Sequence, residues 1–165
     1  MNVASIDVGF IDIPGMTTLN IYCCGCSLCC PDCQNPSLQD FNPEGSYPIT
    51  IHLLREKLKS SLGLCEAVCW LGGEPTEHPE MMRDLILEHQ KIPHVIFSGR
   101  TRQEILDNRM TFDLFDIADA VKVGRWEGKP LGLPGSNQKI YVKHKEIEYL
   151  QLATVLRGNA HVGTP

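Results

Sequence analysis

Six of the eight cysteines in this chain lie within eleven residues, from Cys23 to Cys33. Secreted proteins with disulfides are also rich in cysteine, but thiols this close together are better placed to gather around a metal. Gly25, Pro31 and Asn35 keep the same segment irregular, so we expect a loop there instead of a helix or a strand. The segment therefore predicts reduced thiols that surround a metal centre.

Three of these cysteines have the spacing of an iron–sulfur cluster with one open iron. Cys26, Cys30 and Cys33 follow the pattern C-x3-C-x2-C. Three thiolates hold three irons of a 4Fe-4S cubane and leave the fourth iron without a protein ligand. That iron is then free to bind a substrate or a cofactor.

Other arrangements of the thiols also fit the sequence. The ferredoxin spacing C-x2-C-x2-C-x3-C is followed by Cys23, Cys26, Cys29 and Cys33. Against a ferredoxin, Gln34 stands where that pattern has proline, and only Cys65 and Cys69 remain for a second cluster. These last two cysteines can instead complete a zinc site, and some thiols can be simple packing residues. The spacing favours the cluster with an open iron over these alternatives.

Apolar segments alternate with amphipathic segments along the rest of the chain. The pattern predicts strands at 19–22, 65–71, 94–97 and 120–123, and helices at 50–62, from 79 and from 101. Thr50 is the expected N-cap of the first helix, and Thr101 with Glu104 predicts a capping box for the third. Such alternation predicts an α/β fold with a parallel sheet. Because a closed eight-stranded barrel takes about 250 residues, an open or partial (β/α) barrel fits 165 residues better.

Composition limits the partners and the location of the protein. The net charge of −5 and the scattered basic residues argue against direct binding to nucleic acid. No apolar run reaches the ~20 residues of a membrane-spanning helix, and the first residues do not resemble a signal peptide. We expect a cytoplasmic protein without a membrane segment, with one domain over residues 1–157 and a flexible tail over 158–165.

The loops that follow the predicted strands carry the remaining chemistry. In parallel sheets the ligand site lies beyond the carboxyl ends of the strands. Those loops hold the cysteines, Gly72-Gly73-Glu74 and Ser98-Gly99-Arg100. Glycine lets the backbone approach a ligand closely, and a glutamate accepts a charge-assisted hydrogen bond from a cationic amine. Lys122 and Arg125 can face the same rim, although exposed cations are usually only solvated.

The cysteine motif, followed about forty residues later by Gly72-Gly73-Glu74-Pro75 at a strand end, resembles the radical S-adenosylmethionine (SAM) superfamily. The resemblance implies an open or partial barrel of the radical SAM type, with a 4Fe-4S cluster on Cys26, Cys30 and Cys33. SAM would chelate the open iron through its amino and carboxylate groups. Its ammonium group would be held by Gly72, Gly73 and Glu74. Ser98 and Arg100 would reach its ribose or carboxylate, although a turn that begins a helix explains both residues equally well.

Within that superfamily, the activating proteins of anaerobic ribonucleotide reductase resemble this chain further. Their GC-x3-CPxC-xNP loop is matched from Gly25 to Pro36, and Gly135 to Lys139 is similar to their GSxNQ element. The resemblance implies reductive cleavage of SAM at the cluster and formation of a glycyl radical on the large subunit of the reductase. It also implies an external one-electron donor such as flavodoxin. Cys23, Cys24 and Cys29 are additional to the pattern of this family.

Two other functions stay open from the sequence. A radical SAM enzyme that acts on a small molecule, similar to 7-carboxy-7-deazaguanine synthase, would need no partner protein. A ferredoxin-like electron carrier would use four cysteine ligands and bind no SAM. Replacement of Cys29 separates the carrier, which would lose its cluster, from the SAM enzyme, which would keep it.

Overall fold

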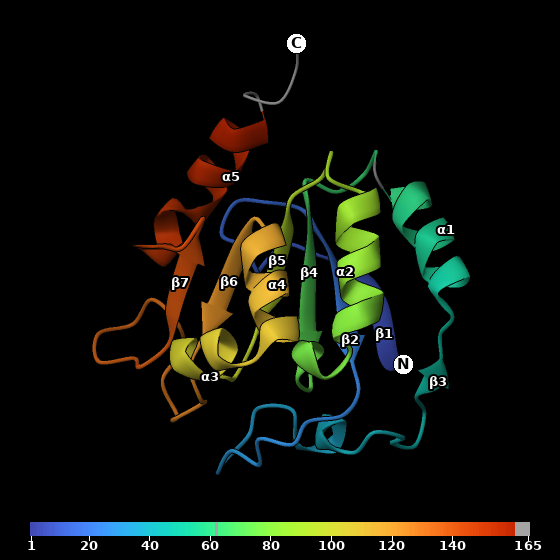
Figure 1. Ribbon diagram of the computed structural model, residues 1–165, viewed down its shortest axis with the longest axis horizontal. Coiled ribbons are helices and arrows are strands. Elements are labelled where there is room, and N and C mark those ends of the chain that lie inside the picture. Colours follow the sequence, from blue (N-terminus) through green and yellow to red (C-terminus); the bar gives the residue numbers. More distant parts are fainter. Residues whose placement is uncertain (62, 161–165) are drawn as a thin grey trace.

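The computed structural model describes residues 1–61 and 63–160, and their strands form one sheet in the order β3-β1-β2-β4-β5-β6-β7-β8. Its centre consists of four parallel neighbours, β2 (Thr18–Cys23), β4 (Ala67–Gly72), β5 (His94–Phe97) and β6 (Ala120–Val123). Antiparallel strands extend both sides: β1 (Asn2–Gly9) and β3 (Tyr47–Pro48) beyond β2, and β7 (Lys139–Val142) and β8 (Lys145–Ile147) beyond β6. The carboxyl ends of the central strands therefore meet at one edge, the lower edge in Figure 1.

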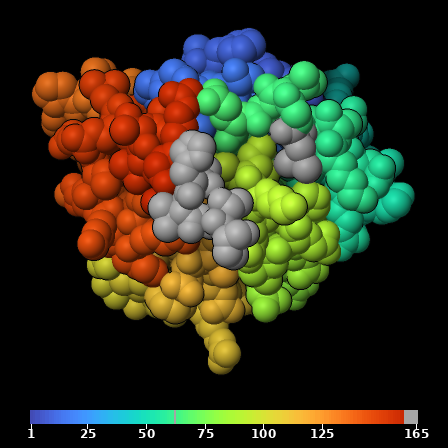
Figure 2. Space-filling model, turned by 90° about the horizontal axis from the view of Figure 1, so that it is seen from above, coloured from blue at the N-terminus to red at the C-terminus, as the bar shows by residue number. Residues whose placement is uncertain are grey.

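Helices cover one face of the sheet, and one helix with a loop covers part of the other. The first face packs against α1 (Ile51–Ser61), α2 (Pro79–Glu88), α3 (Arg102–Asp107) and α4 (Arg109–Ile117). The second face packs against α5 (Leu152–Ala160) and residues 10–17. Figure 2 shows the N-terminal residues on one side of the molecule and α2 with α4 on the opposite side. The chain also forms short 3-10 helices, η1 (Pro36–Gln39), η2 (Pro75–Glu77) and η3 (Tyr149–Gln151).

The predicted central strands and helix starts are confirmed. Each of the four strands lies within two residues of its expected bounds. The hydroxyl of Thr50 accepts a hydrogen bond from the Leu53 N–H at 3.3 Å, as an N-cap does. The capping box of Thr101 and Glu104 is also present. The predicted last residue of the first helix, Leu62, lies outside the described residues.

The carboxyl-terminal part of the chain differs from the expectation. The sequence predicted a flexible tail from residue 158, but α5 continues to Ala160. The rest of the predicted tail, residues 161–165, lies outside the described residues. Leu152 and Leu156 are fully buried against the sheet, which explains why α5 forms. No helix in the described ranges is long and apolar enough to cross a membrane. The radical SAM type of the barrel stays a prediction.

A buried histidine lies in the core between the sheet and the helices. His94 is fully buried, and its Nδ1 accepts a hydrogen bond from the indole N–H of Trp70 at 3.1 Å. Its Nε2 is buried without a hydrogen-bond partner in the part of the chain that the structure describes. Burial lowers the pKa of His94 to about 3, so the ring is neutral in the folded protein.

This histidine should make folding stability depend on pH. The unfolded chain takes up a proton at His94 near pH 6.5, whereas the folded protein does not, so stability falls as the pH drops from about 6.5 toward 3. We expect metal-free protein to lose about 1 kcal/mol of unfolding free energy between pH 7 and pH 5.5. Urea unfolding at both values measures this loss, and His94→Gln should remove it. An equal loss in the variant would assign the effect to other groups.

Candidate iron–sulfur site

The cysteine-rich segment forms a loop along the lower edge of the sheet (Figure 1). It runs from the end of β2 to β3 and contains η1. The N–H groups of Gly25 and Cys26 donate to the carbonyls of Leu38 and Gln39 at 2.9 and 3.0 Å, which joins the two arms of the loop. The N–H of Glu74 donates to the carbonyl of Gly25 at 2.8 Å. The loop is thereby fixed to the segment that follows β4.

Burial separates Cys23 from the cysteines of the loop. Cys23 is fully buried among the apolar side chains between the sheet and the helices. Burial raises the pKa of its thiol to about 12. Iron binds the thiolate and not the thiol, and a side chain enclosed in an apolar core is a poor ligand for a cluster outside it. The geometry therefore disfavours the ferredoxin set, which needs Cys23.

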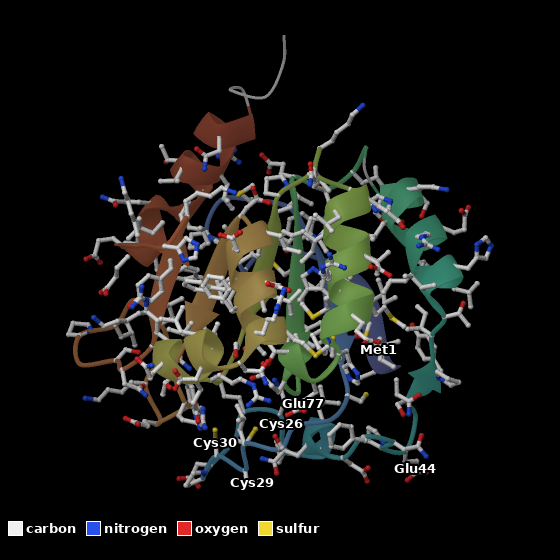
Figure 3. All side chains as sticks on the ribbon, in the orientation of Figure 1. Met1, Cys26, Cys29, Cys30, Glu44 and Glu77 are labelled. Atoms are coloured by element: carbon white, nitrogen blue, oxygen red, sulfur yellow. The ribbon has the colours of Figure 1, made fainter. Side chains whose placement is uncertain are left out.

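Cys26, Cys30 and Cys33 are partly exposed on the loop, with the exposed Cys29 among them. Figure 3 shows Cys26, Cys29 and Cys30 below the edge of the sheet. The pKa of the Cys26 thiol is raised, first by burial, and the charges of Glu74, Cys30 and Cys33 add to the rise. The three cysteines therefore belong to one loop at the carboxyl edge of the parallel strands.

The described residues do not form a site for a single metal ion. Within residues 1–61 and 63–160, no three His, Cys, Asp or Glu side chains converge closely enough to hold one ion. In a cubane each thiolate binds a different iron, so its ligands stand farther apart than those of one ion. Cys65 and Cys69, the other cysteines considered for zinc, are buried in the two cores on opposite faces of the sheet.

Gly72 and Gly73 lie where the segment after β4 passes the cysteine loop. Gly72 has a φ of +107°, and a Cβ there would lie 2.6 Å from the carbonyl oxygen of Cys23. A Cβ on Gly73 would lie 2.5 Å from the carbonyl oxygen of Gly25. Only glycine permits this approach of two backbones. The glycines therefore have a packing role in this structure, and their contact with SAM stays a prediction.

The carboxylate of Glu74 is fully buried and joins the loops that follow β4 and β5. Its Oε1 accepts hydrogen bonds from the N–H and hydroxyl of Thr76, at 3.1 and 2.6 Å, and from the Ser98 hydroxyl at 2.9 Å. Its Oε2 accepts from the N–H of Gly99 at 2.8 Å. A carboxylate has about four acceptor positions, so these donors occupy most of them. The structure brings Glu74 and Ser98 together as expected, while their contacts with SAM stay predictions.

Arg100 extends the same network to the cysteine loop. Its Nε donates to the hydroxyl of Thr76 at 2.9 Å, and its Nη2 forms an ion pair with Glu77 at 3.0 Å. The same oxygen of Glu77 accepts from the hydroxyl of Ser27 at 2.5 Å. Glu77 lies just above Cys26 in Figure 3. The sequence motifs contain no signal that marks Ser27 or Glu77.

A row of partly exposed side chains crosses the sheet on the face opposite to helices α1 to α4. Tyr22, Leu71, Phe97 and Lys122 occupy matching positions near the carboxyl ends of the four parallel strands, and all are partly exposed. The sequence analysis did not identify this row. The available signal was the alternation of side chains in each strand, which puts these four residues on one face.

Lys122 is the cation of this row. Its Nζ donates to the carbonyls of Ser98 and Gly124 at 3.3 and 3.5 Å. Burial lowers the pKa of Lys122 to about 8, although the charges of Glu74 and Cys30 act in the opposite direction. An exposed lysine is ordinarily expected to be fully solvated. Lys122 differs, because it is partly buried and bound to two carbonyls.

Arg125 and the segment from Gly135 to Lys139 border the same rim. Arg125 donates to the carbonyl of Gly99 at 2.6 Å and forms two hydrogen bonds with the carboxylate of Glu104, at 2.7 and 2.9 Å. The side-chain amide of Asn137 donates to the carbonyl of Arg125 at 3.0 Å. The GSxNQ-like element therefore packs against the loop that follows β6.

Comparison with known proteins agrees with this geometry. A family model described as a 4Fe-4S single cluster domain matches residues 12–133, well over half of the chain. The matched range contains the cysteine loop, the loops that follow β4 and β5, and the first part of the loop that follows β6, up to residue 133. A search of curated proteins found no match. Because the match covers well over half of the chain and contains the whole cysteine loop, the chain belongs to the 4Fe-4S single cluster domain family.

Proposed function

We propose that this protein is a radical SAM activase that forms a glycyl radical on the large subunit of anaerobic ribonucleotide reductase. One observation carries the proposal: the loop offers Cys26, Cys30 and Cys33, while Cys23, the further ligand of a ferredoxin set, is enclosed in the core. Three ligands leave one iron of a 4Fe-4S cluster open. An electron carrier has no use for an open iron, whereas SAM cleavage requires one.

The residues at the rim supply complementary charges for SAM, which carries an ammonium, a carboxylate and a sulfonium. The anionic Glu74 and the backbone of Gly72 and Gly73 favour the ammonium group. For the ammonium to bind Glu74 directly, it would have to replace one of the N–H or hydroxyl donors that now occupy the carboxylate. Lys122 adds a half-buried cation for the carboxylate. One electron from an external donor such as flavodoxin, passed through the bound cluster, would break the C5′–S bond to give methionine and a 5′-deoxyadenosyl radical.

The open sheet face favours a large substrate. Tyr22, Leu71, Phe97 and Lys122 stay partly exposed, since α5 and residues 10–17 pack on the other half of that face. A radical has to be shielded from water and from side reactions. A partner protein can cover the row itself, and a hydrogen atom would then pass from a glycine Cα to the 5′-deoxyadenosyl radical. This supports a protein substrate over a small molecule.

Lys122→Met should weaken SAM binding by about tenfold or more, because a hydrogen bond to a charged group contributes about 1.5–3 kcal/mol. Methionine keeps most of the volume and removes only the charge. Titration of SAM into cluster-loaded protein measures the affinity. Lys59→Met is the matched control, because Lys59 is an exposed cation on α1 that is paired with Glu56, and its replacement should leave the affinity unchanged. If both variants bind SAM as tightly as the unchanged protein, Lys122 does not contribute to SAM binding.

The substrate is tested by mixing the reduced, cluster-loaded protein and SAM with the large reductase subunit from the same source. A glycyl radical signal that appears only when all three components are present would support the activase. SAM cleavage that proceeds without the subunit, together with conversion of a small molecule such as a 7-deazaguanine precursor, would support the small-molecule enzyme instead. If SAM is not cleaved under any of these conditions, the electron carrier would be the remaining function.

A further inference from the structure

Besides the backbone hydrogen bonds at Gly25 and Cys26, the side chains of two loop residues anchor the cysteine loop. On the amino-terminal side, Ser27 is bound through its side chain and backbone to Glu77. On the other side, the Asn35 side chain donates to the carbonyl of Gly72 at 3.5 Å. Among the described residues, no hydrogen bond joins residues 29–34 to the rest of the protein. Cys30 and Cys33 lie on this free span, whereas Cys26 adjoins the anchored Ser27.

Glu77 forms the anchor on the side of Cys26. Its Oε1 accepts from the Ser27 hydroxyl at 2.5 Å and from the Ser27 N–H at 3.4 Å. The same oxygen is paired with Arg100 at 3.0 Å, and the two paired side chains are only 19% and 23% exposed. Ser27 itself is exposed. The anchor is thus a shielded ion pair that holds an exposed residue of the loop.

Arg100 connects this anchor to the rigid part of the rim. Its guanidinium also donates to the hydroxyl of Thr76, and that hydroxyl donates to the buried carboxylate of Glu74. The backbone N–H of Arg100 donates to the hydroxyl of Ser98 at 3.0 Å. Thr76, Glu74 and Ser98 are all buried. The position of Ser27 is therefore set by a network that is itself fixed in the core.

We propose that Glu77 is a positioning residue for the cluster. It holds Ser27 against the Arg100 network and so, together with the backbone hydrogen bond from Cys26 to Gln39, fixes Cys26. The span of residues 29–34 would then bring Cys30 and Cys33 to the remaining irons. A ligand that is fixed in advance loses less freedom when the metal binds, and residues that orient metal ligands typically change affinity when they are removed. This inference rests on the cluster assignment and not on SAM cleavage, so it can fail or hold independently of the activase.

The experiment compares Ser27→Ala, Ser27→Thr and Glu77→Gln with the unchanged protein after anaerobic reconstitution with iron and sulfide. A chelator then removes the iron, and the rate of cluster loss is followed by absorbance. Loss of the hydrogen bond from the Ser27 hydroxyl to the Glu77 carboxylate should accelerate cluster loss by about fivefold in Ser27→Ala. Glu77→Gln keeps an acceptor oxygen but removes the charge that pairs with Arg100, so it should also accelerate cluster loss, by less than about fivefold. Ser27→Thr keeps the hydroxyl and should behave as the unchanged protein. Glu80→Gln is the matched control for charge, because Glu80 is exposed three residues farther along the chain.

Two further readouts separate positioning from a general loss of stability. The thermal unfolding midpoint of metal-free Ser27→Ala should not change, because Ser27 is exposed and its bond adds little to global stability. The electron paramagnetic resonance signal of the reduced cluster should broaden in Ser27→Ala and be restored in Ser27→Thr. Cluster loss at the unchanged rate in both Ser27→Ala and Glu77→Gln would overturn the proposal. Failure of the unchanged protein to take up a cluster would instead contradict the cluster assignment.

Discussion

Alanine at Cys26, Cys30 or Cys33 should abolish the cluster, whereas Cys29→Ala should leave it in place. Each of the first three thiols would bind its own iron, and a cubane that loses one of three protein ligands is not retained. Cys29 is exposed and is required only in the ferredoxin set. Iron and acid-labile sulfide per chain, measured after anaerobic reconstitution, should fall to the background level in the first three variants.

Cys23→Ala is the control for the buried cysteine. It should take up the full cluster, and its only expected cost is about 1 kcal/mol of unfolding free energy for the small cavity left in the core. Loss of the cluster in both Cys23→Ala and Cys29→Ala would contradict the three-cysteine assignment and support the four-cysteine carrier. Loss of the cluster in Cys29→Ala but not in Cys23→Ala would show that Cys29 is a ligand in place of one of the three proposed cysteines.

Glu74→Ala should lower the unfolding free energy by about 3 kcal/mol or more, because the four donors around the carboxylate would be left buried without an acceptor. Urea unfolding of the metal-free protein under reducing conditions measures this loss. At temperatures where the variant is folded, it should still take up the cluster and bind SAM more weakly. Glu80→Ala, on an exposed position of α2, should change stability by less than about 0.5 kcal/mol.

Glu74→Gln distinguishes the two roles of this residue. Glutamine keeps one acceptor oxygen but turns an NH2 group toward donors, so part of the stability should be lost. It also removes the negative charge that favours an ammonium group. Full stability together with weak SAM binding would assign Glu74 to SAM alone. Normal SAM affinity in Glu74→Gln and Glu74→Ala would show that the residue serves only to join the loops after β4 and β5.

The sequence predicted the centre of the fold well because its signals are local. The strand that ends at Cys23, the N-cap at Thr50 and the capping box at Thr101 each depend on a few neighbouring residues. The predicted strands likewise indicated which loops share a rim, since the carboxyl ends of parallel strands meet at one edge. Glu74 and Ser98 do lie together there.

The remaining features depend on contacts between residues far apart in the chain. The helix α5 is held by Leu152 and Leu156 against the sheet, and the sequence analysis did not predict it. The same holds for Glu77, whose role becomes visible only when Ser27 and Arg100 meet at its carboxylate. Nor did the spacing of the cysteines decide between the two ligand sets, because spacing does not show that the side chain of Cys23 is buried in the core.

The central claim is an open iron that binds SAM, and it is tested most directly by electron paramagnetic resonance of the reduced, reconstituted protein before and after addition of SAM. We expect the signal of the reduced 4Fe-4S cluster to change when SAM is added and 5′-deoxyadenosine to accumulate. A signal that stays the same at saturating SAM, with no 5′-deoxyadenosine formed, would contradict the open iron and leave a protein that only carries electrons.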